Sequence, residues 1–205
     1  SLVGSEMCIR DRVHTQINSN QLFQICIKKK GLQTGEIFRY LGEHTNLLNE
    51  GQYRTFPDIL SLVIDHKVNS FLEVGRAESR VSELLVNIFH DVNVTCISPD
   101  GLDVKFKNLN VVTELSNNVV GTYVDNSFDM IYFDEHDSYD TVLNNLNSWV
   151  PKVRARGIIA GYDYTRGIAT DTSPTEFAVE HFLDEHGFAI NSGSHNFNFY
   201  WFTKK

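Results

Sequence analysis

The residues from Phe71 to Arg80 constrain the fold more than any other part of the chain. They open with an apolar run around Glu73, turn at Gly75 and continue with small and polar residues. An apolar pattern at helical spacing follows, carried by Val81, Leu84, Leu85, Ile88 and Phe89. This order predicts a strand, a tight turn and a helix. A glycine at such a turn lets the backbone approach a ligand, and the N-terminus of the next helix offers free N–H groups.

The rest of the chain repeats the alternation of strand and helix. We predict strands at 70–75, 93–98, 110–113, 128–134 and 157–161, and helices at 55–67, 81–89, 139–150 and 174–186. Thr55 is the expected N-cap of the first helix, and the link between the second and third strands is too short for a full helix. Strands at 188–191 and 198–203 close the chain as a hairpin. The alternation predicts an α/β fold with a parallel, doubly wound sheet.

Length, charge and cysteine content favour a single α/β domain that neither binds nucleic acid nor spans a membrane. A length of 205 residues suits one α/β domain. The formal net charge is −8 and Lys28–Lys30 is the only basic run, which disfavours a nucleic-acid partner because phosphate binding needs clustered Lys and Arg. No apolar stretch approaches the length of a membrane span. Cys8, Cys26 and Cys96 show neither metal-ligand spacing nor a disulfide framework, which indicates a reducing cytoplasm.

Two further stretches carry chemistry at predicted strand ends. Residues 131–139 read Ile-Tyr-Phe-Asp-Glu-His-Asp-Ser-Tyr, and residues 157–164 read Gly-Ile-Ile-Ala-Gly-Tyr-Asp-Tyr. With the glycine turn, they resemble the motifs of class I S-adenosylmethionine-dependent methyltransferases, and more narrowly those of the methyltransferase domain type 24 family. The resemblance implies a Rossmann-like sheet of order 3-2-1-4-5-7-6 with the last strand antiparallel, in a three-layer sandwich. The closing hairpin disfavours the alternative of a nicotinamide dehydrogenase.

Three segments are expected along the chain. Residues 1–12 look like a translated sequencing adaptor, with a disordered tail as the rival interpretation. By the resemblance, residues 13–54 form an N-terminal lid or extension over the ligand pocket, and a packing role is the alternative. Residues 55–205 hold the methyltransferase-like domain.

The resemblance also assigns a cofactor site for S-adenosylmethionine. The residues that it names are Glu73, Gly75, Ala77, Ser79, Ser98, Asp100, Ser116 and Asp134. Ala77 and Ser79 stand where the family has further glycines. Ser98 stands where the family has the acid that holds the ribose hydroxyls, and Asp100 is the candidate substitute. Ser116 resembles a serine that lies near the adenine, with a helix N-cap as the alternative.

Catalysis is expected at the ends of the fourth and fifth strands. The resemblance names Asp134, His136 and Asp163 as catalytic residues, and Asp134, Asp137 and Asp163 as ligands of Mg²⁺ or Mn²⁺. Such a metal would bind substrate oxygens and lower the pKa of the attacking hydroxyl. Without a metal, His136 could act as general base. The alternative is that these acids cap the next helix.

Other polar and aromatic residues carry weaker signals. Tyr139, Tyr162 and Tyr164 could line the substrate pocket, although aromatic residues at strand ends are often part of the core. His181 and His186 have no partner visible in the sequence, so we expect them to be surface or packing residues.

The leading hypothesis is an S-adenosylmethionine-dependent methyltransferase that modifies a hydroxyl of a small polar, sugar-like molecule, with metal assistance left open. The alternative is a catalytically degenerate Rossmann-like binding module that has lost the cofactor, as the residues at Ala77, Ser79 and Ser98 suggest. The expected partner is a small-molecule acceptor, with neither nucleic acid nor membrane. A homodimer is left open, and the expected location is the cytoplasm.

Overall fold

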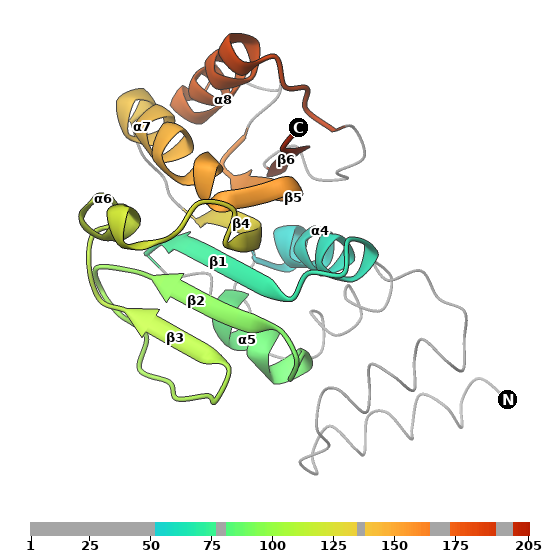
Figure 1. Cartoon of the computed structure of the whole chain (residues 1–205), viewed down its shortest axis with the longest axis vertical. Coiled ribbons are helices and arrows are strands. Elements are labelled where there is room, and N and C mark those ends of the chain that lie inside the picture. Colours follow the sequence, from blue (N-terminus) through green and yellow to red (C-terminus); the bar gives the residue numbers. More distant parts are fainter. Residues whose placement is uncertain (1–51, 77–80, 135–137, 165–172, 192–198) are drawn as a thin grey trace, which may run out of the picture.

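The computed structural model describes residues 52–76, 81–134, 138–164, 173–191 and 199–205. They form a six-stranded sheet with helices on both faces (Figure 1). The strands are β1 (Ser70–Gly75), β2 (Asn93–Ile97), β3 (Leu109–Val112), β4 (Phe128–Asp134), β5 (Val153–Tyr162) and β6 (Phe199–Thr203). The helices are α4 (Gln52–Asp65), α5 (Val81–Ile88), α6 (Ser116–Val119), α7 (Tyr139–Trp149) and α8 (Pro174–His186), with 3-10 turns η1 (Val120–Thr122) and η2 (Val150–Lys152). The predicted tail 1–12 and most of the extension 13–54 lie outside the described residues.

The order of the strands is β3-β2-β1-β4-β5-β6. The pairings from β3 to β5 are parallel, and β6 runs antiparallel to β5. The predicted doubly wound α/β fold with an antiparallel strand near its edge is therefore confirmed. The predicted strand 188–191 is reduced to a single bridge between Ile190 and Phe202, so the outermost strand of the expected order is only marginally formed.

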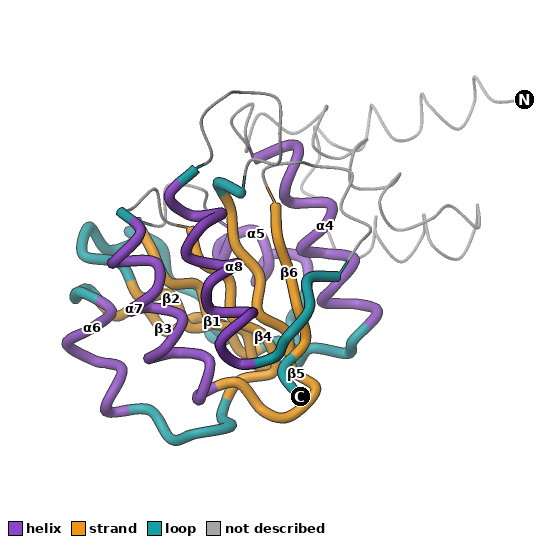
Figure 2. Tube along the Cα trace, turned by 90° about the horizontal axis from the view of Figure 1, so that it is seen from above, coloured by secondary structure: helices purple, strands orange, loops and turns teal. Residues whose placement is uncertain are grey.

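The sheet is the middle layer of a three-layer sandwich. Figure 2 shows α4 and α5 on one side of the strands and α6, α7 and α8 on the other. Successive side chains of a strand point to opposite faces, so a strand covered on both faces is apolar throughout. In β1, Phe71 packs in the core under α4 and α5, while Leu72 and Val74 pack in the core under α7 and α8. In the described ranges, no helix has both the length and the apolar character needed to cross a membrane.

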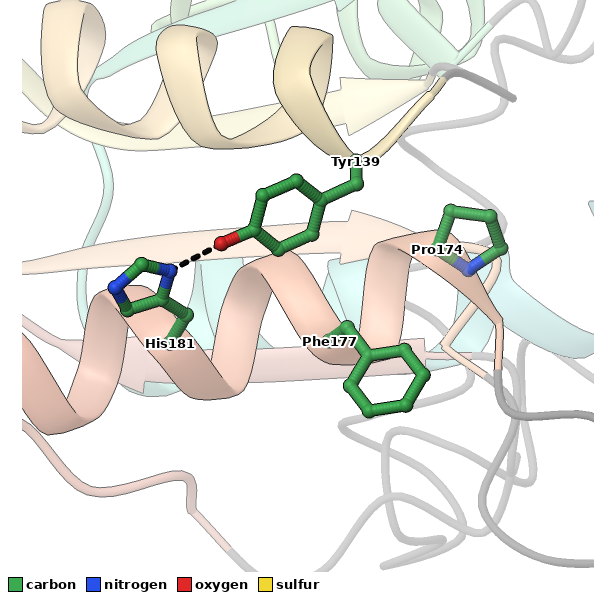
Figure 3. Close-up of a pocket in the computed structure, with 4 residues that line it drawn as sticks. All are labelled: Tyr139, Pro174, Phe177 and His181. Atoms are coloured by element: carbon green, nitrogen blue, oxygen red, sulfur yellow. Dashed lines mark hydrogen bonds between the residues drawn. The ribbon is translucent and has the colours of Figure 1, made fainter.

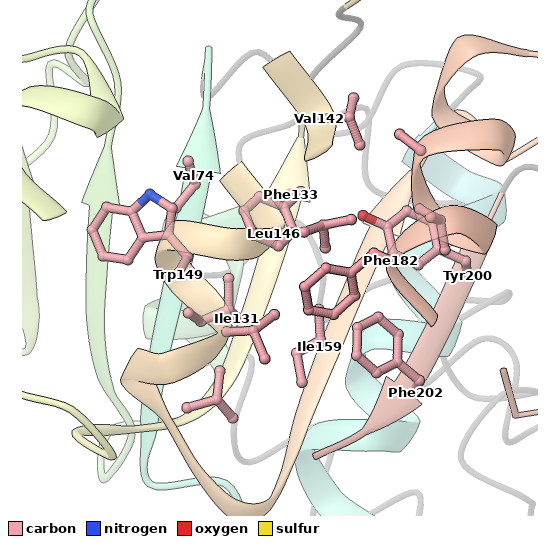
Figure 4. Packing of buried hydrophobic residues seen from close by; sticks show 14 of the residues in the cluster. Val74, Ile131, Phe133, Val142, Leu146, Trp149, Ile159, Phe182, Tyr200 and Phe202 are labelled. Carbon is pink, nitrogen blue, oxygen red and sulfur yellow. The ribbon is translucent and has the colours of Figure 1, made fainter. Parts of the chain in front are cut away.

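The core under α7 and α8 is rich in aromatic side chains (Figure 4). Trp149 and Phe182 of the two helices and Tyr200 and Phe202 of β6 are almost wholly buried there. Burying one such side chain stabilises the fold by about 1.5–3 kcal/mol. These contacts fix α7 and α8 against the strands that carry the candidate site.

Strand β5 is longer than predicted. It begins at Val153 rather than at Gly157, and its pairing with β4 shifts register near its start. Arg156 has a positive φ of 62°, and a Cβ at Gly157 would lie 2.7 Å from the carbonyl oxygen of Asp129. The pairing passes from Phe128–Val153 to Met130–Ile158, and Ala155 and Arg156 between them are exposed. The first part of the strand therefore lacks the continuous apolar pattern on which the prediction relied.

Three predictions about helix N-caps are wrong. α4 begins at Gln52, so Thr55 lies inside the helix and is not its N-cap. α6 begins at Ser116 itself, so the N-cap alternative for that residue is wrong. The N-cap of α7 is Ser138, whose hydroxyl accepts a hydrogen bond from the backbone N–H of Thr141, and not an acidic residue.

The edge of the sheet opposite the candidate site is tied together by Asp129. Its Oδ2 accepts hydrogen bonds from the backbone N–H groups of Asn69 at 2.7 Å and Ser70 at 2.9 Å. Its Oδ1 accepts one from Nε of Arg154. Burial alone would raise the pKa of Asp129, but these hydrogen bonds outweigh it and bring the pKa below its ordinary value. The carboxylate therefore stabilises the start of β1 against β4 and β5.

Candidate functional site

The candidate site lies at the C-terminal edge of the sheet, between β1 and β4. The strand order reverses there, because the chain continues from β1 to β2 and β3 on one side and then crosses to β4 on the other. Ligands of open parallel sheets bind at such a point, outside the carboxyl ends of the strands. Gly75 and Asp134 end the two strands and are partners in the register. The structure therefore brings two of the predicted site residues together.

The turn after β1 has room only for a glycine. Gly75 has a φ of 151°, which residues with a side chain rarely adopt. A Cβ at this position would lie 2.2 Å from the carbonyl oxygen of Asp134. That oxygen belongs to the backbone of β4, so it cannot move aside without moving the strand. Ala77 and Ser79, which follow in the predicted turn, lie outside the described residues.

Glu73 fastens the start of α5 to the sheet. Its side chain is fully buried, and Oε2 accepts a hydrogen bond of 2.8 Å from the backbone N–H of Ser82. N–H groups in the first turn of a helix have no partner within the helix, and a carboxylate there also stabilises the positive end of the helix dipole. This contact is a structural role for Glu73. A contact between Glu73 and the cofactor stays a prediction.

Two protonated side chains flank Glu73 in the sheet. Cys96 of β2 and Tyr132 of β4 are its partners in the register. Burial, followed by the charge of Glu73, raises the pKa of Cys96 to about 12. Burial also raises the pKa of Tyr132 well above its ordinary value, with smaller contributions from Asp134 and Glu73. Both side chains therefore stay neutral at neutral pH.

Asp134 presents a carboxylate at the end of β4. The residue is half-buried, and the hydroxyl of Tyr132 lies 3.5 Å from its Oδ1, which is a long hydrogen bond. Because Tyr132 keeps its proton, the hydroxyl donates and the carboxylate accepts. The Tyr132 hydroxyl thus orients the Asp134 carboxylate, and the exposed part of Asp134 remains accessible to a ligand at the C-terminal edge of the sheet.

The end of β2 carries Ser98 and Asp100. Ser98 is fully buried, and its hydroxyl has no hydrogen-bond partner in the part of the chain that the structure describes. The carbonyl of Ser98 accepts a hydrogen bond of 3.1 Å from the N–H of Gly101, and this turn leaves Asp100 exposed. A buried polar group without a partner costs free energy. A contact between Ser98 and a cofactor stays a prediction, and Asp100 is the residue of this turn that a ligand can reach.

Ser116 lies at the same edge of the sheet, because α6 follows the C-terminal end of β3. Its hydroxyl donates a hydrogen bond of 3.2 Å to Oδ1 of Asn145, a buried residue of α7. The contact links α6 to α7 across the ends of the strands. A role for Ser116 beside the adenine stays a prediction.

Asp163 follows β5 and has a positive φ of 66°. Its carbonyl oxygen accepts a hydrogen bond of 3.0 Å from the hydroxyl of Ser173, which is also the N-cap of α8. The end of β5 and the start of α8 are therefore joined directly. Tyr164 is buried, and its hydroxyl donates to Oε1 of Glu180 at 3.2 Å, so the structure places this tyrosine in the core between β5 and α8.

The predicted metal site is only partly described. Asp134 and Asp163 end or follow neighbouring strands, as the sequence predicted. Among the described residues, no group of three or more His, Cys, Asp or Glu side chains could hold a metal ion. The third predicted ligand, Asp137, and the predicted base, His136, lie outside those ranges. A site for Mg²⁺ or Mn²⁺ stays a prediction.

Tyr139 pairs with His181, a contact that the sequence did not predict. The Tyr139 hydroxyl and Nδ1 of His181 share a hydrogen bond, and the rings are stacked with an interplanar angle of 15°. The two residues are 42 positions apart, on different helices, so no local pattern could reveal the contact. His181, expected to be a surface or packing residue, is exposed but paired.

No family model matches the chain, and no curated protein matches it.

Solved structures, in contrast, share the fold. A putative caffeoyl-CoA O-methyltransferase from Staphylococcus aureus is 15% identical with a TM-score of 0.60, over 92% of this chain and 99% of that one. An SAH-bound methyltransferase from Podospora anserina is 10% identical with a TM-score of 0.58, over 93% and 97%. An O-methyltransferase from Bacillus cereus in complex with SAH is 14% identical with a TM-score of 0.50, over 91% and 98%. At these identities the likeness establishes the Rossmann-like fold of such methyltransferases and nothing finer.

Proposed function

We propose that the chain is an S-adenosylmethionine-dependent methyltransferase that transfers a methyl group to a hydroxyl of a small molecule. One observation carries the proposal: at the reversal point of the sheet, the backbone of Gly75 lies so close to Asp134 that no side chain fits between them. A bare backbone beside a half-exposed carboxylate at that point suits a small charged ligand. The fold shared with solved methyltransferases supports this choice over other Rossmann-like enzymes.

The residues present fit S-adenosylmethionine. The backbone at Gly75 would lie against its methionine part, and the exposed carboxylate of Asp100, at the end of β2, would receive the ribose hydroxyls. When bound, this cofactor supplies an activated methyl group. The chain itself contributes position, because Glu73 holds the start of α5 and so fixes the turn that begins at Gly75.

The acceptor hydroxyl must lose its proton as the methyl group is transferred. Asp134 is oriented by Tyr132 and half-exposed, so it can accept a hydrogen bond from that hydroxyl. Asp163 stands at the end of the neighbouring strand, and His136 is the predicted general base. In this scheme Asp134 and Asp163 hold the hydroxyl by hydrogen bonds, and His136 receives its proton as the methyl group is transferred.

The test is a methyl-transfer assay with labelled S-adenosylmethionine and a panel of sugar-like and aromatic hydroxyl compounds. For the acceptor that the panel identifies, Asp134→Ala should lower the rate by about a hundredfold or more, because the hydroxyl loses the group that positions it for transfer. Asp184→Ala, at an exposed site on α8, is the matched control and should keep the full rate. A folded Asp134→Ala protein with full activity would show that the site is assigned wrongly.

The second candidate is a binding module that has lost the cofactor. It is favoured by Ser98, because a serine hydroxyl at the position of the ribose acid offers a weaker acceptor than a carboxylate, and this one is fully buried. Under this alternative, a folded sample would bind neither S-adenosylmethionine nor its product, and no acceptor would be methylated.

A further inference from the structure

An open groove of about 480 Å³ lies between the beginnings of α7 and α8. It is lined by Tyr139, Pro174, Phe177 and His181, shown together in Figure 3. We call it the α7/α8 groove. Its volume falls within the roughly 300–1,000 Å³ that is usual for small-molecule sites. Three of the four lining side chains are aromatic or heteroaromatic rings, and the fourth is a proline ring.

The walls of the groove are held in place from two helices. The Tyr139 hydroxyl reaches from the first residue of α7 to Nδ1 of His181 on α8, and the ring centroids lie 6.0 Å apart. Each ring thereby fixes the orientation of the other. Nδ1 is occupied by this contact, and none of the described residues makes a hydrogen bond to Nε2, the other ring nitrogen.

Phe177 leaves apolar surface uncovered beside this pair. It is 53% exposed, although its neighbours Ala178 and Val179 on α8 are fully buried. Pro174, the first residue of the helix, is exposed on the same side of the groove. A flat ring that packed against Phe177 would remove this surface from water.

The groove adjoins the candidate site through both strands that carry the predicted catalytic acids. Ser173, directly before Pro174, donates its hydrogen bond of 3.0 Å to the carbonyl of Asp163. Tyr139 begins the helix that follows β4, the strand that ends at Asp134. A ligand in the groove would therefore lie beside the ends of β4 and β5.

We infer that the α7/α8 groove holds the methyl acceptor and that the acceptor is an aromatic hydroxyl compound rather than the sugar-like molecule that the sequence suggested. The inference rests on the proposed function. Ring faces stack favourably on aromatic side chains. A sugar carries several hydroxyls that each need a hydrogen-bond partner, and the four lining residues offer such a partner only at the Tyr139–His181 pair.

The test uses the full chain saturated with S-adenosylhomocysteine and two probes of similar size, p-nitrophenol and methyl β-glucoside. Binding is followed by nuclear magnetic resonance on the ring protons of His181, assigned with a His181→Gln variant. p-Nitrophenol should shift these signals in a saturable way, and methyl β-glucoside should not. Phe177→Ala should raise the dissociation constant of p-nitrophenol about fivefold, the size expected for one lost aromatic contact.

Val124→Ala is the matched control, because Val124 is the most exposed large apolar residue of the described part, at 76%, and does not line the groove. It should leave the dissociation constant unchanged. Saturable shifts with methyl β-glucoside alone, or equal affinities of the Phe177→Ala and Val124→Ala proteins for p-nitrophenol, would overturn the inference. If the folded protein fails to bind S-adenosylhomocysteine, the proposed function fails, and the inference fails with it. If that ligand binds and p-nitrophenol does not, only the inference fails.

Discussion

Gly75 and Asp134 face each other across the β1–β4 pairing so closely that a methyl group on Gly75 would lie 2.2 Å from the Asp134 carbonyl oxygen. The contact joins the two strands that flank the reversal point of the sheet. It leaves bare backbone at the one place where an open parallel sheet binds its ligands. The pairing of β1 with β4 therefore requires a glycine at position 75, and the same backbone is a candidate binding surface.

Gly75→Ala should lower the free energy of unfolding by at least about 2 kcal/mol, because the new methyl group meets backbone and the φ of Gly75 disfavours any side chain. Gly121→Ala is the control, since nothing lies within 4 Å of the Cβ it would add. Urea unfolding followed by circular dichroism measures both. Equal stability of the two variants would contradict the close approach of β1 and β4.

Glu73→Ala should destabilise the protein by about 1–3 kcal/mol, because it leaves the N–H of Ser82 without its buried partner. Glu73→Gln keeps an acceptor oxygen at that position and should cost less. Hydrogen exchange of the Ser82 amide reports on the same contact and should become faster in the alanine variant only. An unchanged exchange rate in Glu73→Ala would mean that the carboxylate does not hold the start of α5.

Cys96 should resist alkylation in the folded protein. Only the thiolate reacts, and with a pKa of about 12 roughly one Cys96 thiol in ten thousand is ionised at pH 8. Iodoacetamide labelling in a Cys8→Ser, Cys26→Ser background, read by mass spectrometry, should modify Cys96 only after urea is added. Rapid labelling without denaturant would show that the thiol is neither buried nor held neutral.

Asp129 should make stability depend on pH in the acidic range. Its pKa is lower in the folded than in the unfolded chain, so its contribution is complete above the unfolded value of about 3.9 and is lost as the pH falls through the folded value. Asp129→Asn should therefore cost about 1–2 kcal/mol at pH 7, for the loss of hydrogen bonds to a charged group. The difference from the parent protein should narrow as the pH falls below about 3.9.

The control for that experiment is Asp125→Asn, which removes an exposed ion pair with Lys152 and should change stability little. Thermal or urea unfolding at several pH values measures both variants. A difference for Asp129→Asn that stays constant from pH 7 to the lowest pH of the folded state would rule out the carboxylate as its cause.

The central strands could be predicted from the sequence because burial on both faces makes them continuously apolar. Both β1 and β4 have the predicted bounds, and their ends bring Gly75 and Asp134 together. The start of β5 could not be predicted, since Ala155 and Arg156 are exposed where the pairing with β4 shifts register, and Arg154 pairs with Asp129 of the neighbouring strand. Such a shift depends on the neighbouring strand and not on local preference.

Side-chain contacts between elements that are distant in the chain also could not be predicted from the sequence. Tyr139 and His181 each lie on a helix that was predicted correctly or nearly so, yet the hydrogen bond between them depends on how α7 and α8 pack on the sheet. The bond from Ser82 to Glu73 is similar, because it requires the turn after β1 to bring the helix back over the strand. Side-chain pairing of this kind follows from tertiary packing, which a single sequence does not display.

The most direct test of the account is a calorimetric titration of S-adenosylhomocysteine into the full chain, with and without magnesium. The account predicts saturable binding in the micromolar range to a site built on Gly75, Asp100 and Asp134, with binding abolished in Gly75→Arg. Heat changes no larger than those of buffer at millimolar ligand, from a sample that circular dichroism shows to be folded, would contradict it.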